Sequence, residues 1–200
     1  LIDMTIFEES RFYRPMSGKV YRMFPVETHR GCPYLCAFCN SPSQMAMYKS
    51  KGGKSYLRRK HFDNIKKELT FYKDVMKAEY LYFWADTFFS WKKGEFLEFA
   101  ELYKEIGLPF WCQTRVETVS RDRLEVLKDI GCARISFGIE HGDEKFRSEK
   151  INRKMSNELI VEKLGIVRQV GIPFSVNNII GFPEETRELA FETVKLNRRF

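Results

Sequence analysis

Short apolar runs alternate with helical patterns along this 200-residue chain. In "KEIGLPFW", "KDIGCARI" and "RQVGIPFS" a helical pattern ends, a glycine follows, and an apolar run begins. Gly107, Gly131 and Gly171 are therefore predicted to follow helix C-termini, where glycine accepts the left-handed conformation. Runs that are apolar almost throughout are typical of strands covered on both faces. Five strands are predicted, at residues 21–29, 80–84, 110–114, 133–139 and 174–180.

Five helices are expected because apolar residues recur at steps of three and four. Ser120 and Ser156 stand where they could cap the third and the fourth. The helix–glycine–strand order is typical of βα units and a parallel sheet. Pro25 would interrupt a central strand, so we expect the first strand at an edge. The predicted fold is α/β, a partial, open parallel βα barrel with about five units. The apolar faces are Ile65, Leu69, Tyr72 and Met76; Phe96, Phe99, Tyr103 and Ile106; Leu124, Leu127 and Ile130; Ile160, Leu164 and Val167; and Leu189, Thr193 and Leu196.

Composition places the chain among globular proteins. Apolar residues make up 44% and charged residues 30%, which argues against disorder. No apolar run is as long as a membrane span and no signal-peptide pattern opens the sequence, so we expect a cytoplasmic protein without membrane contacts. The cysteines number five, and three of them are crowded between positions 32 and 39. This spacing suits a metal or redox cluster better than a disulfide framework.

The net charge of +7 comes partly from one segment, "KSKGGKSYLRRK" at Lys49–Lys60, which carries cations and no acid. Such a run contacts an anionic substrate or nucleic acid in some proteins and is a solvated loop in others. No nucleic-acid-binding module surrounds it, which favours the solvated loop. Nucleic acid is therefore not an expected partner.

Each predicted strand leads into polar or metal-liganding residues. Because ligands of parallel βα folds bind beyond the carboxyl ends of the strands, we expect one large site at that end of the sheet. The residues, in strand order, are Cys32, Cys36 and Cys39; Asp86; Thr114 and Arg115; Ser136, Gly138 and Glu140; and the stretch "NNIIGFPEE".

The three cysteines are separated by three residues and then by two. Thiolates select zinc, copper(I) or iron–sulfur clusters, and structural zinc takes a closed set of four ligands. A [4Fe–4S] cluster usually takes four cysteines, so three leave one iron open for a substrate or cofactor. Cys112 and Cys132 each begin a strand, and we expect them to be buried core thiols.

The string "CPYLCAFC" resembles the C-x₃-C-x-aromatic-C motif of the radical S-adenosylmethionine (SAM) enzymes. That family places the motif after the first strand of an open parallel βα barrel. The resemblance implies a [4Fe–4S] cluster on Cys32, Cys36 and Cys39, with its open iron bound to the amino and carboxylate groups of SAM. It also implies an external electron donor and cleavage of SAM to methionine and a 5′-deoxyadenosyl radical.

Other stretches match the family in order, and the resemblance implies that they bind SAM. "FWADTFF" stands at the strand-two motif without its Gly-Gly-Glu wording, which leaves Asp86 as the candidate. "NNIIGFPEET" resembles the G-x-I-x-G-x-x-E motif of strand five, with Asn177 in place of the first glycine and Glu184 as the glutamate. The resemblance implies that the guanidinium of Arg115 meets the SAM carboxylate. The implied cofactor-binding residues are Phe38, Asp86, Arg115, Ser136, Glu140, Arg153, Ile179 and Gly181.

The phrases "ETHRGCPYLCAFCNSP", "GIEHGDE" and "IIGFPEET" most resemble the branch with a cobalamin-binding domain ahead of the barrel, and methylthiotransferases share part of them. This implies methyl transfer to carbon, rearrangement or thioether-type chemistry in a parent protein that uses cobalamin, on a small-molecule or peptide substrate. We expect residues 1–19 to be a linker from such a domain. Residues 20–200 are expected to be a radical SAM core domain that is C-terminally incomplete, because the barrel's sixth strand is absent.

Two alternatives stay open from the sequence. One is a zinc-stabilised, non-catalytic module that binds an anionic polymer through Lys49–Lys60, with His29 or His61 as the fourth ligand beside the cysteines. The other keeps the barrel and the cluster, but its site is incomplete without the sixth strand or a partner domain.

Overall fold

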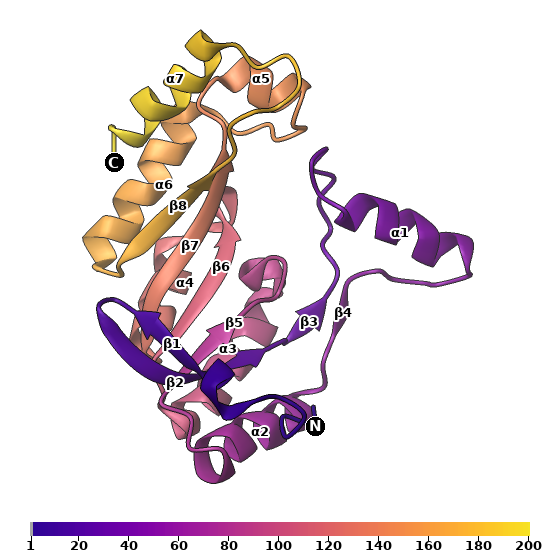
Figure 1. Cartoon of the computed structure of the whole chain (residues 1–200), viewed down its shortest axis with the longest axis vertical. Helices are drawn as coiled ribbons and strands as arrows, with labels where there is room; N and C mark the ends of the chain where they lie inside the picture. Colours follow the sequence, from indigo (N-terminus) through magenta and orange to yellow (C-terminus); the bar gives the residue numbers. More distant parts are fainter. Residues whose placement is uncertain (1) are drawn as a thin grey trace.

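A six-stranded sheet lies at the centre of the molecule, in the order β1-β2-β5-β6-β7-β8 (Figure 1). The computed structural model describes residues 2–200. The strands from β2 to β8 are parallel, whereas β1 is antiparallel to β2. The expected partial parallel βα barrel is thereby confirmed. The strands of this sheet are β1 Tyr13–Met16, β2 Lys19–Val26, β5 Tyr80–Phe83, β6 Phe110–Arg115, β7 Cys132–Glu140 and β8 Phe174–Asn178.

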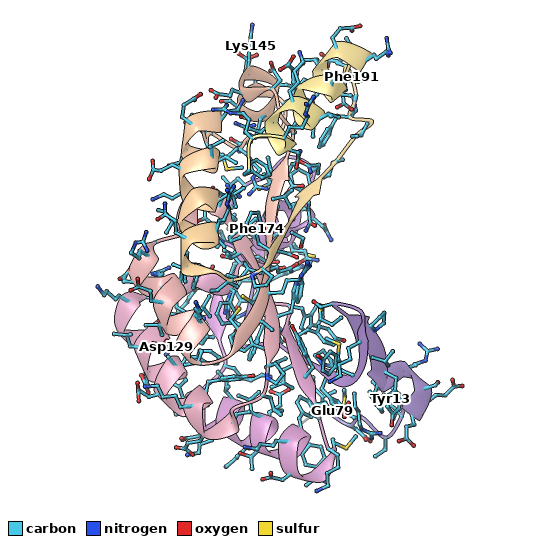
Figure 2. The ribbon with its side chains drawn as sticks, turned by 90° about the vertical axis from the view of Figure 1, so that its left-hand side faces the viewer. Tyr13, Glu79, Asp129, Lys145, Phe174 and Phe191 are labelled. Carbon is cyan, nitrogen blue, oxygen red and sulfur yellow. The ribbon has the colours of Figure 1, made fainter. Side chains whose placement is uncertain are left out.

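Helices cover one side of this sheet (Figure 2). α2, α3, α4 and α6 pack in a row, each against the next. All five predicted helical patterns form helices, and the pattern that begins with α2 continues as a π-helical turn over Phe71–Val75. The helices are α1 Ser41–Ser50, α2 Phe62–Thr70, α3 Lys93–Ile106, α4 Arg121–Asp129, α5 Glu144–Glu149, α6 Asn157–Val170 and α7 Arg187–Asn197, with 3-10 turns at Glu9–Phe12, Phe88–Ser90 and Val116–Thr118.

The prediction that the first strand lies at an edge is wrong. β1 pairs with β2 on its outer side, from Tyr13 opposite Arg22 to Met16 opposite Lys19. Pro25 lies beyond this hairpin, where β2 pairs with β5 alone. Its missing N–H therefore breaks no outer ladder, which is why a proline is accepted in a strand that has two neighbours.

Part of the segment expected to be a linker, residues 1–19, is folded onto the sheet. Met4 and Phe12 are buried in the core, and the Phe12 ring stacks on Phe24 with centroids 4.7 Å apart. Leu1 lies outside the described residues, and the linker role of the segment stays a prediction.

The helix ends follow the expected chemistry with one exception. Gly107, Gly131 and Gly171 all have positive φ angles, between 65° and 94°. The Ser156 hydroxyl accepts the backbone N–H of Leu159 at the start of α6. Ser120 stands at the N-cap of α4, but its hydroxyl donates to the Asp122 carboxylate instead of accepting a backbone N–H.

The core beneath the site is aromatic. The Phe83 ring on β5 contacts Phe88, Phe99, Tyr103 and Phe110, with centroids 5.2 to 5.6 Å away. Cys112 and Cys132 are buried among these side chains, as predicted. Within residues 2–200, every helix is too short or too polar to cross a bilayer.

Candidate functional site

The carboxyl ends of the parallel strands open into one cavity of about 190 Å³. It lies where the chain leaves β2, β5, β6, β7 and β8, which is where the sequence predicts a site. Its lining includes nearly all the predicted site residues and adds Thr87 and Gln113. The lining residues are Cys32, Cys36, Phe38, Cys39, Asp86, Thr87, Gln113, Thr114, Arg115, Ser136, Gly138, Glu140, Arg153 and Asn177.

The cysteine loop is held in place from outside itself. The backbone N–H of Ala37 donates to the Ile151 carbonyl at 3.0 Å, and the Asn152 amide donates to the Leu35 carbonyl at 2.7 Å. Both anchors come from the segment after α5, far along the chain. The loop is therefore positioned by the β7 side of the sheet as well as by β2.

Each of the three sulfurs meets a polar group. The guanidinium of Arg115 donates to Cys36 Sγ at 3.0 Å, and the backbone N–H of Ser41 donates to Cys39 Sγ at 3.4 Å. The Thr87 hydroxyl lies 3.7 Å from Cys32 Sγ. Cys36 is buried, Cys32 half-buried and Cys39 exposed, and burial raises the pKa of the Cys32 thiol. N–H donors such as those on Cys36 and Cys39 stabilise thiolate ligands, so this set of thiols fits an iron–sulfur cluster.

Arg115 makes two polar interactions at the site. Its Nε donates to the Glu117 carboxylate at 2.8 Å, while Nη1 donates to Cys36. The guanidinium carbon also lies 3.8 Å from the centre of the Tyr34 ring. The ion pair and the ring fix the orientation of the cation, so that one N–H is directed at the cysteine loop.

A second ion pair lines the same cavity at the end of the neighbouring strand, β7. Arg153 Nη1 donates to Glu140 Oε1 at 2.5 Å, and both side chains are buried. Burial raises the pKa of the Glu140 carboxyl, and Arg153 acts against that rise. Glu140 adopts a φ of 71° at a register shift between β7 and β8. Residues other than glycine rarely adopt this backbone conformation. Its carboxylate consequently lies close over Gly138.

Asp86 and Ser136 are in the cavity wall, but their surroundings differ. Asp86 is exposed at the rim of the cavity. The groups around its carboxyl still remove part of the surrounding water, and this desolvation raises the pKa of Asp86. Ser136 is buried and already engaged, because its hydroxyl accepts the Trp111 indole N–H at 2.9 Å and lies 2.7 Å from the Ser175 hydroxyl.

Ile179 and Gly181 do not line this cavity. Ile179 contributes through its backbone, whose N–H donates to the Glu140 carbonyl at 2.9 Å. Gly181 has a φ of 94°, and its N–H donates to the carboxylate of Glu185. Glu184, which the sequence motif picks out, is exposed and pairs with Lys150.

The sequence interpretation missed a buried pair, His141 and Glu185. His141 Nδ1 accepts the backbone N–H of Asp143, so Nε2 is the protonated nitrogen, and it lies 3.0 Å from Glu185 Oε1. Together with the Gly181 contact, this pair ties the loop after β8 to the end of β7. The signal in the sequence was weak, since Glu184 and Glu185 are adjacent and the motif spacing selects the first.

The histidines proposed as a fourth zinc ligand are engaged elsewhere. His29 is buried, its Nε2 donating to the Thr87 carbonyl at 2.9 Å and its Nδ1 lying 3.1 Å from the Thr28 hydroxyl. His61 is exposed and pairs with Asp63. Across residues 2–200, no three His, Cys, Asp or Glu side chains converge on a point that one ion could occupy. A cubane does not require such a point, because each thiolate binds a different iron.

We expect His29 to make stability depend on pH. Burial lowers the pKa of His29 below its ordinary value of 6.5, and the nearby charges of Asp86, Glu27 and Arg59 modify that shift. As the pH falls below 6.5, the unfolded chain takes up this proton before the folded protein does, so stability is lost; above 6.5 the contribution is fully present. Denaturant unfolding between about pH 7.5 and 5.5 should show a smaller loss for His29→Gln than for the wild type. Equal losses would contradict the assignment.

The comparisons with known proteins agree with this geometry. A family model described as the radical SAM superfamily matches residues 26–196. An uncharacterized methyltransferase of Pyrococcus horikoshii is 28% identical over 176 residues, covering 87% of this chain and 36% of that protein. The anaerobic magnesium-protoporphyrin IX monomethyl ester cyclase of Rubrivivax gelatinosus is 26% identical over 204 residues, covering 98% of this chain and 34% of that protein.

A solved structure shares the fold. The radical SAM methyltransferase TsrM of Kitasatospora setae, with cobalamin and a [4Fe–4S] cluster bound, has a TM-score of 0.69 at 18% identity, covering 94% of this chain and 38% of that chain. The present chain thus spans little more than a third of these relatives. Because the family model covers most of its residues, the chain belongs to the radical SAM superfamily, whose members use a [4Fe–4S] cluster and SAM.

Proposed function

We propose that the 190 Å³ cavity binds a [4Fe–4S] cluster through Cys32, Cys36 and Cys39 and holds SAM beside it. The observation that carries the proposal is that the three thiols and two buried guanidiniums, Arg115 and Arg153, line one cavity. When bound, the cluster supplies one electron that cleaves SAM to methionine and a 5′-deoxyadenosyl radical. The family match supports this function over that of a zinc-stabilised module.

The chain's own residues would bind and orient SAM. Arg115, fixed by Glu117 and Tyr34, offers a cation to the SAM carboxylate close to Cys36. Glu140, held by Arg153, offers an acceptor to the ribose hydroxyls. Ser136 is expected to share that task only if its hydroxyl turns from Ser175.

The remaining contacts lie at the rim. Phe38 is exposed beside the third cysteine and meets Phe182 edge-on at 6.2 Å, which leaves a ring face for the adenine. Asp86 offers an acceptor for the methionine amino group. Ile179 and Gly181 act through backbone conformation, by holding the loop that closes this side.

For the parent protein we propose cobalamin-dependent methyl transfer or rearrangement on a small-molecule or peptide substrate. Support comes from the methyltransferase relative and from the fold shared with a cobalamin-bound methyltransferase.

The function is tested by anaerobic reconstitution. Iron and acid-labile sulfide, the electron paramagnetic resonance spectrum after dithionite reduction, and 5′-deoxyadenosine formed from SAM are measured on the same sample. A reduced [4Fe–4S] signal and dithionite-dependent 5′-deoxyadenosine are expected. A chain that binds one zinc and no sulfide would refute the proposal.

We expect Gly138→Ala to weaken SAM binding without unfolding the protein. A Cβ at Gly138 would come within 3.0 Å of the Glu140 carboxylate, a flexible group that must then leave its place beside Arg153. Loss of one well-placed charged hydrogen bond corresponds to about a tenfold rise in the dissociation constant. Equilibrium binding of SAM to the reconstituted variant measures it.

Gly165→Ala is the matched control. It adds the same methyl group on α6, where nothing lies within 4 Å, and should leave SAM affinity unchanged. Equal affinity of Gly138→Ala and the wild type would show that the Glu140–Arg153 pair does not contact SAM.

A further inference from the structure

The segment 41–60, which we call the basic arm, carries charge that the rest of the molecule does not neutralise. It comprises α1, the loop after it and strand β4 (Arg58–Arg59), and α1 projects away from the sheet (Figure 1). Arg59 pairs with Glu95, and Lys60 with Glu68. The other cations have no acidic partner within 4.0 Å among residues 2–200 and are exposed. These are Lys49, Lys51, Lys54 and Arg58.

The basic arm is built directly onto the cysteine loop. α1 begins at Ser41, whose N–H donates to Cys39 Sγ. At its other end, β4 pairs with β3 (His29–Arg30), which immediately precedes the loop. The Tyr56 backbone packs so closely on Gly31 that a Cβ there would come within 3.0 Å of it. The unpaired Arg58 is therefore held opposite Arg30, two residues before Cys32, whereas Lys49, Lys51 and Lys54 lie at or just beyond the far end of α1.

A second cavity, of about 640 Å³, lies between the basic arm and the end of β5. Aromatic and apolar side chains line it, including Tyr48, Tyr56, Met47 and Trp84; Met47 is 62% and Trp84 52% exposed. Asp86 lines both this cavity and the 190 Å³ cavity that contains the three cysteines. The cations Arg30, Lys51 and Arg58 also line this second cavity, together with the acids Glu27 and Asp86. Exposed apolar anchors beside charged side chains are the composition of a transient protein interface.

We propose that the basic arm is the docking surface for a small, acidic one-electron carrier protein. The inference rests on the proposed function, because only a cluster in the cavity needs an electron from outside. In the transfer, the carrier is oxidised by one electron and the cluster is reduced by one, and no bond forms or breaks. Complementary charge steers such encounters, and complexes for electron transfer are small and weak.

Nucleic acid is the competing occupant of a basic surface. The carrier is favoured because the arm is joined at both ends to the cysteine loop, where an electron must enter. Two of its unpaired cations, Lys51 and Arg58, also line a compact cavity with exposed apolar side chains instead of following an extended groove.

The test compares reduction by protein with reduction by a small chemical. The variant K49E/K51E/K54E reverses three unpaired, exposed cations of the arm. The control K19E/K67E/K145E makes the same change of charge at exposed lysines elsewhere. Each reconstituted protein forms 5′-deoxyadenosine from SAM either with dithionite or with an acidic flavodoxin, its reductase and NADPH.

We expect the arm variant to lose about tenfold or more in kcat/KM for the flavodoxin at low salt, with its dithionite-driven rate unchanged. The gap between variant and wild type should narrow as salt rises, because screening removes the attraction. The control should match the wild type with both reductants. As a readout independent of turnover, calorimetric or NMR titration should show flavodoxin binding to the wild type and to the control, and much weaker binding to the arm variant.

Two outcomes would overturn the inference. One is an arm variant that the flavodoxin reduces as well as it reduces the wild type, while a short RNA duplex binds the wild type and not the variant. The other is an equal loss with dithionite, which would make the arm part of the cluster site. Absence of 5′-deoxyadenosine from the wild type with dithionite would instead refute the proposed function, and the titration would still decide the docking surface.

Discussion

We expect the Cys36→Ala variant, after anaerobic reconstitution, to hold no [4Fe–4S] cluster and to form no 5′-deoxyadenosine from SAM. Two thiols cannot hold a cubane in place, and no other cysteine lines the cavity to replace the third. Cys36 is also the sulfur that receives one N–H of the Arg115 guanidinium, so its removal leaves that N–H without an acceptor while the Glu117 pair remains. Iron, sulfide and product are assayed as for the wild type.

The Cys112→Ala variant is the control, because it removes a thiol that is not expected to bind the cluster. Cys112 is fully buried on β6 and lies outside the cavity. Its replacement should cost about 1 kcal/mol of stability, typical of a core truncation, and leave the iron content unchanged. A Cys36→Ala protein that keeps iron and sulfide, or a Cys112→Ala protein that loses them, would contradict the assignment of the ligands.

Gly31→Ala is expected to damage both the fold and the cluster. Gly31 has a φ of 89°, where a non-glycine residue costs about 1–2 kcal/mol. The added Cβ also overlaps the rigid backbone of Tyr56, and forced overpacking costs about 1–3 kcal/mol more. Because Gly31 directly precedes Cys32, the shift that relieves the overlap moves the first ligand. Thermal or denaturant unfolding and the iron content of the reconstituted variant measure the two effects.

Gly52→Ala is the control variant, because it introduces backbone strain at a positive φ without a steric overlap of the added Cβ. Its φ is 81°, but nothing lies within 4 Å of the added Cβ. We expect it to lose only about 1 kcal/mol and to keep a full cluster. If the two variants behave alike, the contact between Gly31 and the Tyr56 backbone does not position the loop.

Most of the site was predictable from the sequence because it follows the parallel strands. Cys32, Asp86, Arg115 and Glu140 are far apart in the chain, yet each comes at the end of a buried apolar run. Parallel strands end at one edge of their sheet, so those residues meet in the cavity. The strand pattern therefore predicted that these four residues come together, although not how their side chains pair, whereas Phe38 and Arg153 followed only from the family resemblance.

Three short strands that the sequence analysis did not predict, β1, β3 and β4, have no apolar pattern in the sequence. β1 has the sequence YRPM and is mostly exposed, and it is held mainly by pairing with β2. β3 and β4 are two residues each and basic apart from His29. The buried partner of His141 was Glu185 and not its neighbour Glu184, a difference set by the turn conformation of a φ of 67° at Glu184. Side-chain pairing of this kind depends on three-dimensional packing.

The cysteines of the core and those of the cavity will differ in how readily they are oxidised by air. Cys112 is sealed beneath aromatic rings, and burial raises the pKa of its thiol well above the ordinary value, so little nucleophilic thiolate forms there. Cys39 is open to solvent beside a backbone amide. Exposure to air will accordingly destroy the cysteine-dependent activity of this protein long before it unfolds the chain. An inactivated sample will therefore still show a native fold.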